Sequence, residues 1–194
     1  MRIIQFERKT KETDISIEIN LDGTGEYDIS TSIPFLDHML NLFSFHGGID
    51  LKIRAAGDID IDYHHLMEDL GISLGEAVRK ALGDKKGIIR YGEATIPMDE
   101  SLSQVVIDIS GRPYLVYKVN PPGKTLRGLE VSLFEDFFRA FSNHSLMNLH
   151  INLRYGRDVH HIFESIFKAF GRALKMAAAI DRKGRDIPST KGRL

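Results

Sequence analysis

The sequence predicts an α+β fold made of two duplicated half-domains, each with the element order βββαβα. Two segments 96 positions apart, Asp62–Glu68 and Asp158–Glu164, share the pattern Asp-x-His-His-x-x-Glu. Apolar residues at helical spacing follow both segments and occupy the same five positions in each copy. Upstream of each copy lie short alternating stretches that are typical of strands. Similarity at a fixed spacing indicates an internal repeat.

The elements of the first half follow from local patterns. Asp14–Leu21 alternates strictly, with isoleucine or leucine at every second position, and the Asp22–Gly25 segment turns the chain. We expect short opening strands that include residues 14–21 and 27–31, a helix over 35–45, a strand over 49–55 and a helix from the first His-His pair to about Gly83.

The second half repeats this order. We expect strands over residues 92–97, 102–109 and 114–119, a helix over 133–143, a strand over 148–154 and a helix over 159–179. Lys85-Lys86-Gly87 is the predicted junction, so the half-domains are residues 1–87 and 88–180. Each should be a small, mostly antiparallel sheet with its helices on one face, and the two should pack back to back. The basic tail, residues 181–194, is either a frayed end or a segment that a ligand orders.

Composition restricts the possible functions. The 194 residues carry a net charge of −1, so the chain lacks the excess of basic residues that is typical of proteins that bind nucleic acid or an anionic membrane. The chain has no cysteine, so imidazole and carboxylate groups remain as metal ligands, and these suit Mn, Zn, Fe or Co. The N-terminus lacks a signal-peptide pattern, and no apolar run approaches the length of a membrane span. We therefore expect a cytoplasmic enzyme.

The repeated triplet predicts two metal sites. Helical residues four positions apart lie about 40° apart around the axis, so His64 and Glu68 can bind one ion, as can His160 and Glu164. The second histidine of each pair is rotated by about 100° and cannot readily reach the same ion. Each helix would then chelate one ion and lend its second histidine to the other. The alternative is a surface His-His pair followed by a solvated glutamate, and recurrence in register on two helices disfavours it.

Several motifs together resemble the imidazoleglycerol-phosphate dehydratase family. They are Arg8–Thr13, Phe35–Leu40, Asp62–Asp69, Ser110–Pro113, Tyr155–Asp158 with His160-His161, and Ile187–Gly192. The resemblance covers essentially the whole chain. It implies dehydration of D-erythro-imidazole-glycerol phosphate to imidazole-acetol phosphate and water in histidine biosynthesis. It also implies half-domains similar to domain 2 of ribosomal protein S5, two Mn2+ ions per active site and a homo-oligomer, expected as a 24-mer.

The resemblance also implies a ligand set. It assigns one ion to His38, His65, His160 and Glu164, and the other to His64, Glu68, His161 and a fourth ligand on the helix over 133–143. The family pattern has histidine at that fourth position, and this chain has Asp136. A carboxylate is a sound ligand for Mn2+, although Glu135, His144 or His150 could complete the site instead. The alternative for Asp136 is an acid on a helix face in water.

Further roles follow from the same resemblance. Glu12 corresponds to an acid or base near the reacting carbons, and His65, Glu68, His160 and Glu164 complete the catalytic set. The expected substrate contacts are Glu12, His38, His46, His64, His65, Glu68, His160 and His161, with Arg90, Arg112, Ser189, Thr190, Lys191 and Gly192 around the phosphate. Without the resemblance, each of the cations is more often a solvated surface residue, and the place of His46 at a helix C-terminus explains that residue nearly as well.

The chemistry of such a substrate agrees with this ligand set. The proton that must be removed has no carbonyl group to acidify it, so the imidazole ring itself must accept electrons, as an imidazolate or diazafulvene-like intermediate. Two divalent cations near the ring nitrogens would stabilise that charge. Two rivals remain: a dimetal hydrolase that cleaves a phosphoester or amide, and a non-enzymatic module that binds RNA or stores metal. Turnover of the imidazole substrate, measured against release of phosphate, separates the three.

Overall fold

The computed structural model describes residues 2–181, 186–192 and 194 of the chain. The elements are β1 (Ile3–Lys9), β2 (Thr13–Asn20), β3 (Tyr27–Ser30), α1 (Pro34–Gly47), β4 (Asp50–Gly57), α2 (His64–Leu82), β5 (Tyr91–Met98), β6 (Ser101–Asp108), β7 (Tyr114–Lys118), β8 (Thr125–Leu126), β9 (Leu129–Glu130), α3 (Leu133–Ser145), β10 (Asn148–Tyr155) and α4 (Val159–Ala178). The predicted α+β fold with repeated βββαβα order is therefore confirmed. The short β8–β9 hairpin is an addition in the second half.

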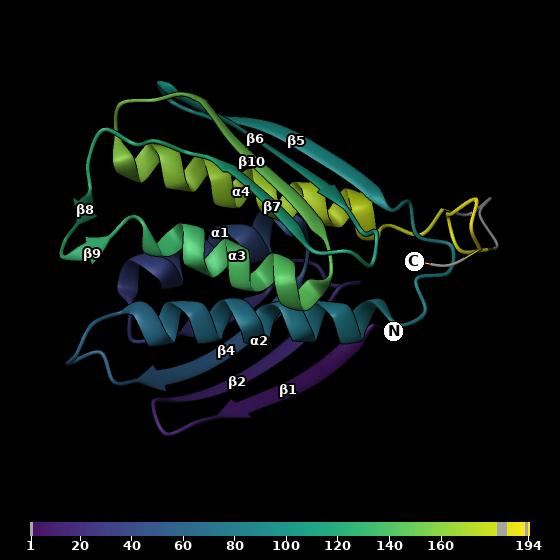
Figure 1. The fold of residues 1–194 in the computed structure, drawn as a ribbon, viewed down its shortest axis with the longest axis horizontal. Coiled ribbons are helices and arrows are strands. Elements are labelled where there is room, and N and C mark those ends of the chain that lie inside the picture. The colour runs from purple at the N-terminus through teal and green to yellow at the C-terminus, as the bar shows by residue number, and fades with distance from the viewer. Residues whose placement is uncertain (1, 182–185, 193) are drawn as a thin grey trace.

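The two halves form matching four-stranded sheets. Their strand orders are β1-β2-β4-β3 and β5-β6-β10-β7. In each sheet one edge strand, β3 or β7, runs parallel to its neighbour, and the other pairs are antiparallel. The sheets form the two outer layers and the four helices lie between them (Figure 1). The exact boundary between half-domains at residue 87 stays a prediction.

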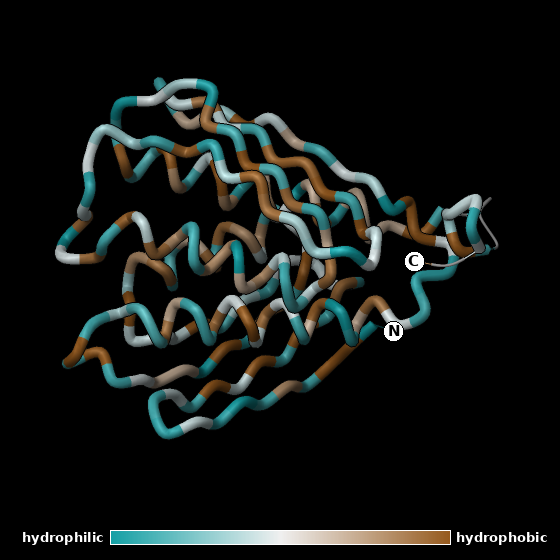
Figure 2. The backbone as a smooth tube through the Cα atoms, in the orientation of Figure 1, coloured by the Kyte–Doolittle hydropathy of each residue, from teal (hydrophilic) through white to brown (hydrophobic). Residues whose placement is uncertain are grey.

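Alternation along the strands explains why the helices cover one face of each sheet. In β2, Ile15, Ile17 and Ile19 are buried while the residues between them face outward. Brown apolar and teal polar positions alternate along the outer strands in Figure 2. Between the layers, phenylalanine rings from α3 and α4 pack closely, and the rings of Phe134 and Phe163 stack with centroids 4.2 Å apart. Burial of such rings is the main favourable contribution to this packing.

Glycines let each long helix pack on the shorter helix of the other half. A Cβ atom added at Gly171 of α4 would lie 2.3 Å from the carbonyl oxygen of Phe43 in α1. A Cβ atom at Gly75 of α2 would lie 2.8 Å from the carbonyl oxygen of Phe141 in α3. Gly75 and Gly171 are the same position of the repeat, and α2–α3 and α1–α4 are equivalent contacts. All four helices begin at the same end of the molecule (Figure 1).

The C-terminal tail lies at the opposite end (Figure 1). Part of the predicted tail, residues 182–185 and 193, falls outside the described residues. In the remainder, the carbonyl oxygen of Asp186 accepts a hydrogen bond from the Gly87 amide at 3.1 Å, and that of Pro188 accepts one from Arg90 at 2.9 Å. The described helices include none that is long and apolar enough to cross a membrane.

Candidate metal centre

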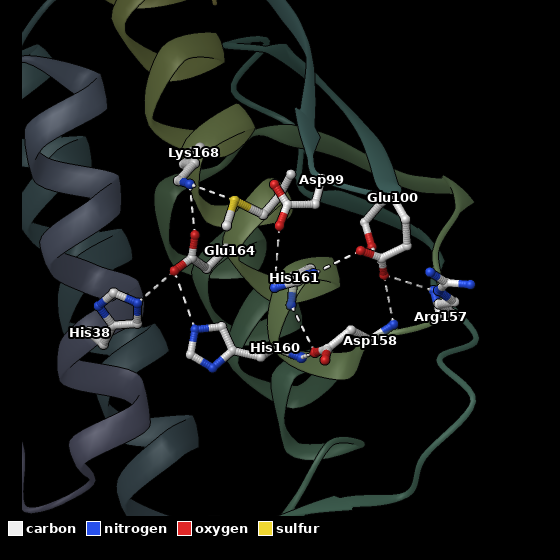
Figure 3. A network of polar contacts seen from close by, with 11 residues as sticks. His38, Asp99, Glu100, Arg157, Asp158, His160, His161, Glu164 and Lys168 are labelled. Carbon is white, nitrogen blue, oxygen red and sulfur yellow. Dashed lines mark hydrogen bonds and ion pairs between the residues drawn. The ribbon is translucent and has the colours of Figure 1, made fainter.

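The first donor cluster joins α1 to α4. His38 comes from α1, and His160 and Glu164 come from one face of α4. The Oε1 atom of Glu164 lies 2.8 Å from His38 Nε2 and 3.2 Å from His160 Nε2 (Figure 3). One ligand atom from each residue can be placed within 4.8 Å of the others. Two imidazoles and a carboxylate that converge in this way fit a divalent cation such as Mn2+ or Zn2+.

Glu164 is held as an anion. Its side chain is 10% exposed, and Lys168, one turn further along α4, lies 2.7 Å from its second oxygen. Burial alone would raise the pKa of this carboxyl, but the hydrogen bonds from Lys168, His38 and His160 outweigh burial and lower the pKa to about 2. The cluster therefore offers a full negative charge to a cation at neutral pH.

A second, looser group lies at the equivalent place in the fold. Nε2 of His64 lies 4.0 Å from Glu68 of the same helix, α2, and Nδ1 of His64 lies 3.8 Å from Asp136 of α3, so the two carboxylates approach opposite nitrogens of the ring. Among the described residues, the donor atoms of His38, His160 and Glu164 all lie within 4.8 Å of one another, and those of the second group do not. Asp136 follows His38 by 98 positions, the same offset that relates the Phe-Ser-x-His segments at the ends of α1 and α3. Asp136 is thus the counterpart of His38 across the duplication.

The other three candidates for the fourth position have different surroundings. Glu135 pairs with Arg139, one turn along α3. His144 lies 3.4 Å from Glu76 near the end of α3. His150 lies in the middle of β10, between β6 and β7. Of the four, Asp136 is the residue with a contact to His64, so the geometry favours Asp136.

The second histidine of each pair lies outside these clusters. His65 has its Nδ1 atom 3.0 Å from Asp58 and 4.0 Å from Glu12. His161 has its Nδ1 atom 2.7 Å from Glu100, and its Nε2 atom lies 3.9 Å from Asp99. Within the described part of one chain, His65 does not join the group of His38, His160 and Glu164. The rotation around the helix axis that the sequence predicts is therefore present, and each cluster has three donors from one chain.

Duplicated aspartates fix the start of α2 and α4, the two helices that carry the His-His pairs. The Oδ1 atom of Asp158 accepts hydrogen bonds from the amides of His160 and His161, at 2.7 and 3.3 Å. The Oδ1 atom of Asp62 accepts the amide of His64 at 2.7 Å. Aspartate at a helix N-terminus satisfies backbone amides that have no partner within the helix. This role explains why the repeat includes an aspartate two residues before the first histidine.

The predicted phosphate contacts are Arg90, Arg112 and the residues of the C-terminal tail. Arg90 makes two contacts with Asp108, at 2.7 and 3.2 Å, besides its bond to Pro188. Arg112 is exposed, and the tail from Ser189 to Gly192 closes a turn through a 2.9 Å hydrogen bond between those two residues. Thr190 and Lys191 are exposed within that turn. α4 has 20 residues and therefore spans about 30 Å between the two ends.

His46 lies in the last turn of α1, about two turns after His38. Burial lowers the pKa of His46, and the positive charges of Lys168 and Arg172 lower it further. His46 is therefore neutral at pH 7 and can accept a hydrogen bond as well as donate one.

Sequence reasoning missed Lys168, Asp58, Asp99 and Glu100. Lys168 carried a recognisable signal because it stands four residues after Glu164 on the predicted helix. Asp58 follows β4, and Asp99 and Glu100 form the turn between β5 and β6. Acidic residues in turns are common, so nothing in the sequence distinguishes these three from ordinary turn residues.

Comparison with known proteins agrees with the fold. A family model described as imidazoleglycerol-phosphate dehydratase matches residues 31–174. The protein of that name from Thermodesulfovibrio yellowstonii is 58% identical over 99% of each chain, and that from Geobacter sulfurreducens is 55% identical over 97% of each.

Solved structures of the same name are also similar. The crystal structure of imidazoleglycerol-phosphate dehydratase from Staphylococcus aureus has a TM-score of 0.82 at 40% identity, over 91% of this chain and 99% of that one. The structure from Pyrococcus furiosus has a TM-score of 0.84 at 39% identity, over 97% of this chain and 99% of that one. The predicted resemblance is confirmed: the chain belongs to the imidazoleglycerol-phosphate dehydratase family of lyases.

Proposed function

We propose that this chain dehydrates D-erythro-imidazole-glycerol phosphate to imidazole-acetol phosphate in histidine biosynthesis. The observation that carries the proposal is the cluster of His38, His160 and Glu164, with a looser counterpart around His64 at the same end of the fold, in a chain whose relatives bear this enzyme's name. Loss of the hydroxyl group from the carbon attached to the ring, and of a proton from the next carbon, gives an enol that becomes the ketone of the product. Neither the C–O bond nor the C–H bond that breaks is activated in the free substrate, so the site must activate both.

The clusters would hold two metal ions, proposed as Mn2+. His38, His160 and Glu164 would bind one ion, and His64, Glu68 and Asp136 the other. Nitrogen and oxygen donors of this kind suit Mn2+. When bound, the two cations would supply positive charge beside the imidazole ring of the substrate, which stabilises negative charge in that ring by several kcal/mol.

We further propose that a complete site combines several copies of the chain. Each cluster has three donors, while His65 and His161 face carboxylates elsewhere in the same chain. The clusters lie at the start of α4, and the tail that holds the predicted phosphate contacts follows its end; the helix between them spans about 30 Å, a distance that the three-carbon chain of the substrate cannot bridge. If the tail of one copy lay against the clusters of another copy, a single site could contain both the metal ligands and the phosphate contacts. A homo-oligomer follows from this need, and its size, a 24-mer, is proposed from the family resemblance alone. A cytoplasmic location stays a prediction.

Within such a site the side chains have separate tasks. The carboxylate of Glu12, next to His65 and 54% exposed, is placed to take up or deliver the proton at carbon. Arg112, Ser189 and Lys191 would bind the phosphate with charge-assisted hydrogen bonds. Arg90 already donates hydrogen bonds to Asp108 and Pro188, so its main contribution would be to hold the tail in place for the phosphate.

Metal removal tests the proposal. Protein treated with a chelator and then supplied with Mn2+ should lose and regain dehydration activity, with about two ions bound per chain at full activity. Release of inorganic phosphate, measured in the same reactions, should stay at background, because a dimetal hydrolase would release it. Full dehydration activity in metal-free protein would contradict the dimetal proposal, and absence of any turnover would favour a binding or storage module.

A further inference from the structure

The second histidine of each pair contacts a carboxylate through the same ring nitrogen, Nδ1. Glu100 lies 2.7 Å from Nδ1 of His161, and Asp58 lies 3.0 Å from Nδ1 of His65. Figure 3 shows the first of these contacts, with His161 turned away from the cluster of His38, His160 and Glu164. In contrast, His160 contacts Glu164 through its Nε2 atom.

The two carboxylates come from positions that the duplication does not relate. Asp58 is the first residue after β4, and the first residue after β10, the counterpart of β4, is Gly156. Glu100 belongs to the turn between β5 and β6, whose counterpart in the first half is the β1–β2 turn that carries Glu12. The same contact is thus made in both halves by residues of separate origin. Simple duplication of one hydrogen bond does not explain it, whereas a shared requirement of His65 and His161 does.

Glu100 is itself held rigidly. Its Oε1 atom accepts hydrogen bonds from the amides of Asp158 and Arg157, at 2.8 and 3.2 Å, and from the hydroxyl of Ser101 at 3.1 Å. Its other oxygen is left for His161. One side chain therefore ties the β5–β6 turn, the start of α4 and the His161 ring together.

We propose that Asp58 and Glu100 are positioning residues that prepare His65 and His161 to bind metal. An ionised carboxylate accepts a hydrogen bond from Nδ1–H, which keeps the proton on Nδ1, leaves the lone pair on Nε2 and fixes the ring direction. Nε2 then becomes the ligand atom that each histidine presents to a neighbouring copy. This inference rests on the proposed dimetal function, and it assigns to two turn residues the task of orienting ligands that their own chain does not use.

The test combines metal affinity with the tautomer of the rings. In Asp58→Asn and Glu100→Gln the shape is kept and the charge is lost, and loss of such a partner typically costs 10- to 100-fold in metal affinity. Titration with Mn2+ should show this loss for one of the two ions per chain in each variant. Glu93→Gln is the matched control, because Glu93 is an exposed glutamate on β5; its affinity should equal that of the unmodified protein.

Solid-state 15N NMR of metal-free protein provides a readout that needs no metal. Signals assigned through His65→Asn and His161→Asn should show the Nδ1–H tautomer in the unmodified protein, and a shifted mixture for His161 in Glu100→Gln. Unchanged tautomers together with unchanged Mn2+ affinity in both variants would overturn the inference. Failure of the unmodified protein to bind two ions would instead overturn the proposed function, and the NMR result would still decide whether the carboxylates orient the rings.

Discussion

The glycine contact between α4 and α1 is predicted to control the first metal cluster. In Gly171→Ala the new Cβ atom would lie 2.3 Å from the Phe43 carbonyl oxygen and 3.0 Å from the Gly47 amide nitrogen. Carbon and oxygen normally approach to about 3.3 Å, so the helices must separate by roughly 1 Å. His38 lies on one helix and Glu164 on the other, and their 2.8 Å contact would lengthen accordingly. The perturbation therefore reaches the cluster although Gly171 binds nothing.

The expected loss can be estimated from two opposing contributions. Overpacking costs about 1–3 kcal/mol, and the upper value applies because the contacted atoms belong to backbone and cannot rotate away. Alanine gains about 1 kcal/mol over glycine within a helix, which leaves a net loss of about 2 kcal/mol. For a chain of this length such a loss lowers the melting temperature by about 4–8 °C.

The assay is thermal unfolding of metal-free protein, followed by Mn2+ content after reloading. Gly171→Ala should melt earlier and hold close to one ion per chain. Gly75→Ala, with a contact of 2.8 Å to Phe141, should show a smaller loss and affect the other cluster. Met176→Ala is the control, because Met176 is 48% exposed on the same helix. The reasoning is refuted if Gly171→Ala melts at or above the unmodified protein and retains both ions.

The remaining predictions concern the second cluster, the tail and pH. Asp136→Ala should reduce bound Mn2+ by one ion per chain while Glu135→Ala should not, and equal effects would show that Asp136 has no special role. Removal of residues 187–194 should raise KM for the phosphorylated substrate roughly 10- to 100-fold, because a charge-assisted contact contributes about 1.5–3 kcal/mol, and an equal loss on the dephosphorylated substrate would mean that the tail supports the fold instead. The pKa of Glu164 is lowered from 4.5 to about 2, so in metal-free protein its ionised form stabilises the fold by about 3 kcal/mol above pH 4.5, and this contribution should disappear as the pH falls towards 2. Urea unfolding at pH 7 and pH 3, compared with Glu164→Gln, measures that contribution, and a difference independent of pH would contradict it.

The sequence by itself determined the fold class and the triplet on each metal-site helix. Both depend on local periodicity: alternation buries every second residue of a strand such as β2, and a four-residue spacing puts His160 and Glu164 on one helix face. The offset of 96 also identified Gly75 and Gly171 as equivalent positions. The β8–β9 hairpin could not be predicted in this way, because strands of two residues are too short to show a period.

Tertiary structure alone decided which distant residues meet. Each long helix packs on the shorter helix of the other half, which brings His38 to Glu164 across 126 positions and Asp136 to His64. Glu100 reaches His161 across 61 positions from a turn whose residues carry no periodic signal. The tail lies at the end of the molecule away from the clusters because the four helices begin together at the other end. Periodicity describes one element at a time, whereas these contacts depend on how the elements are placed relative to one another.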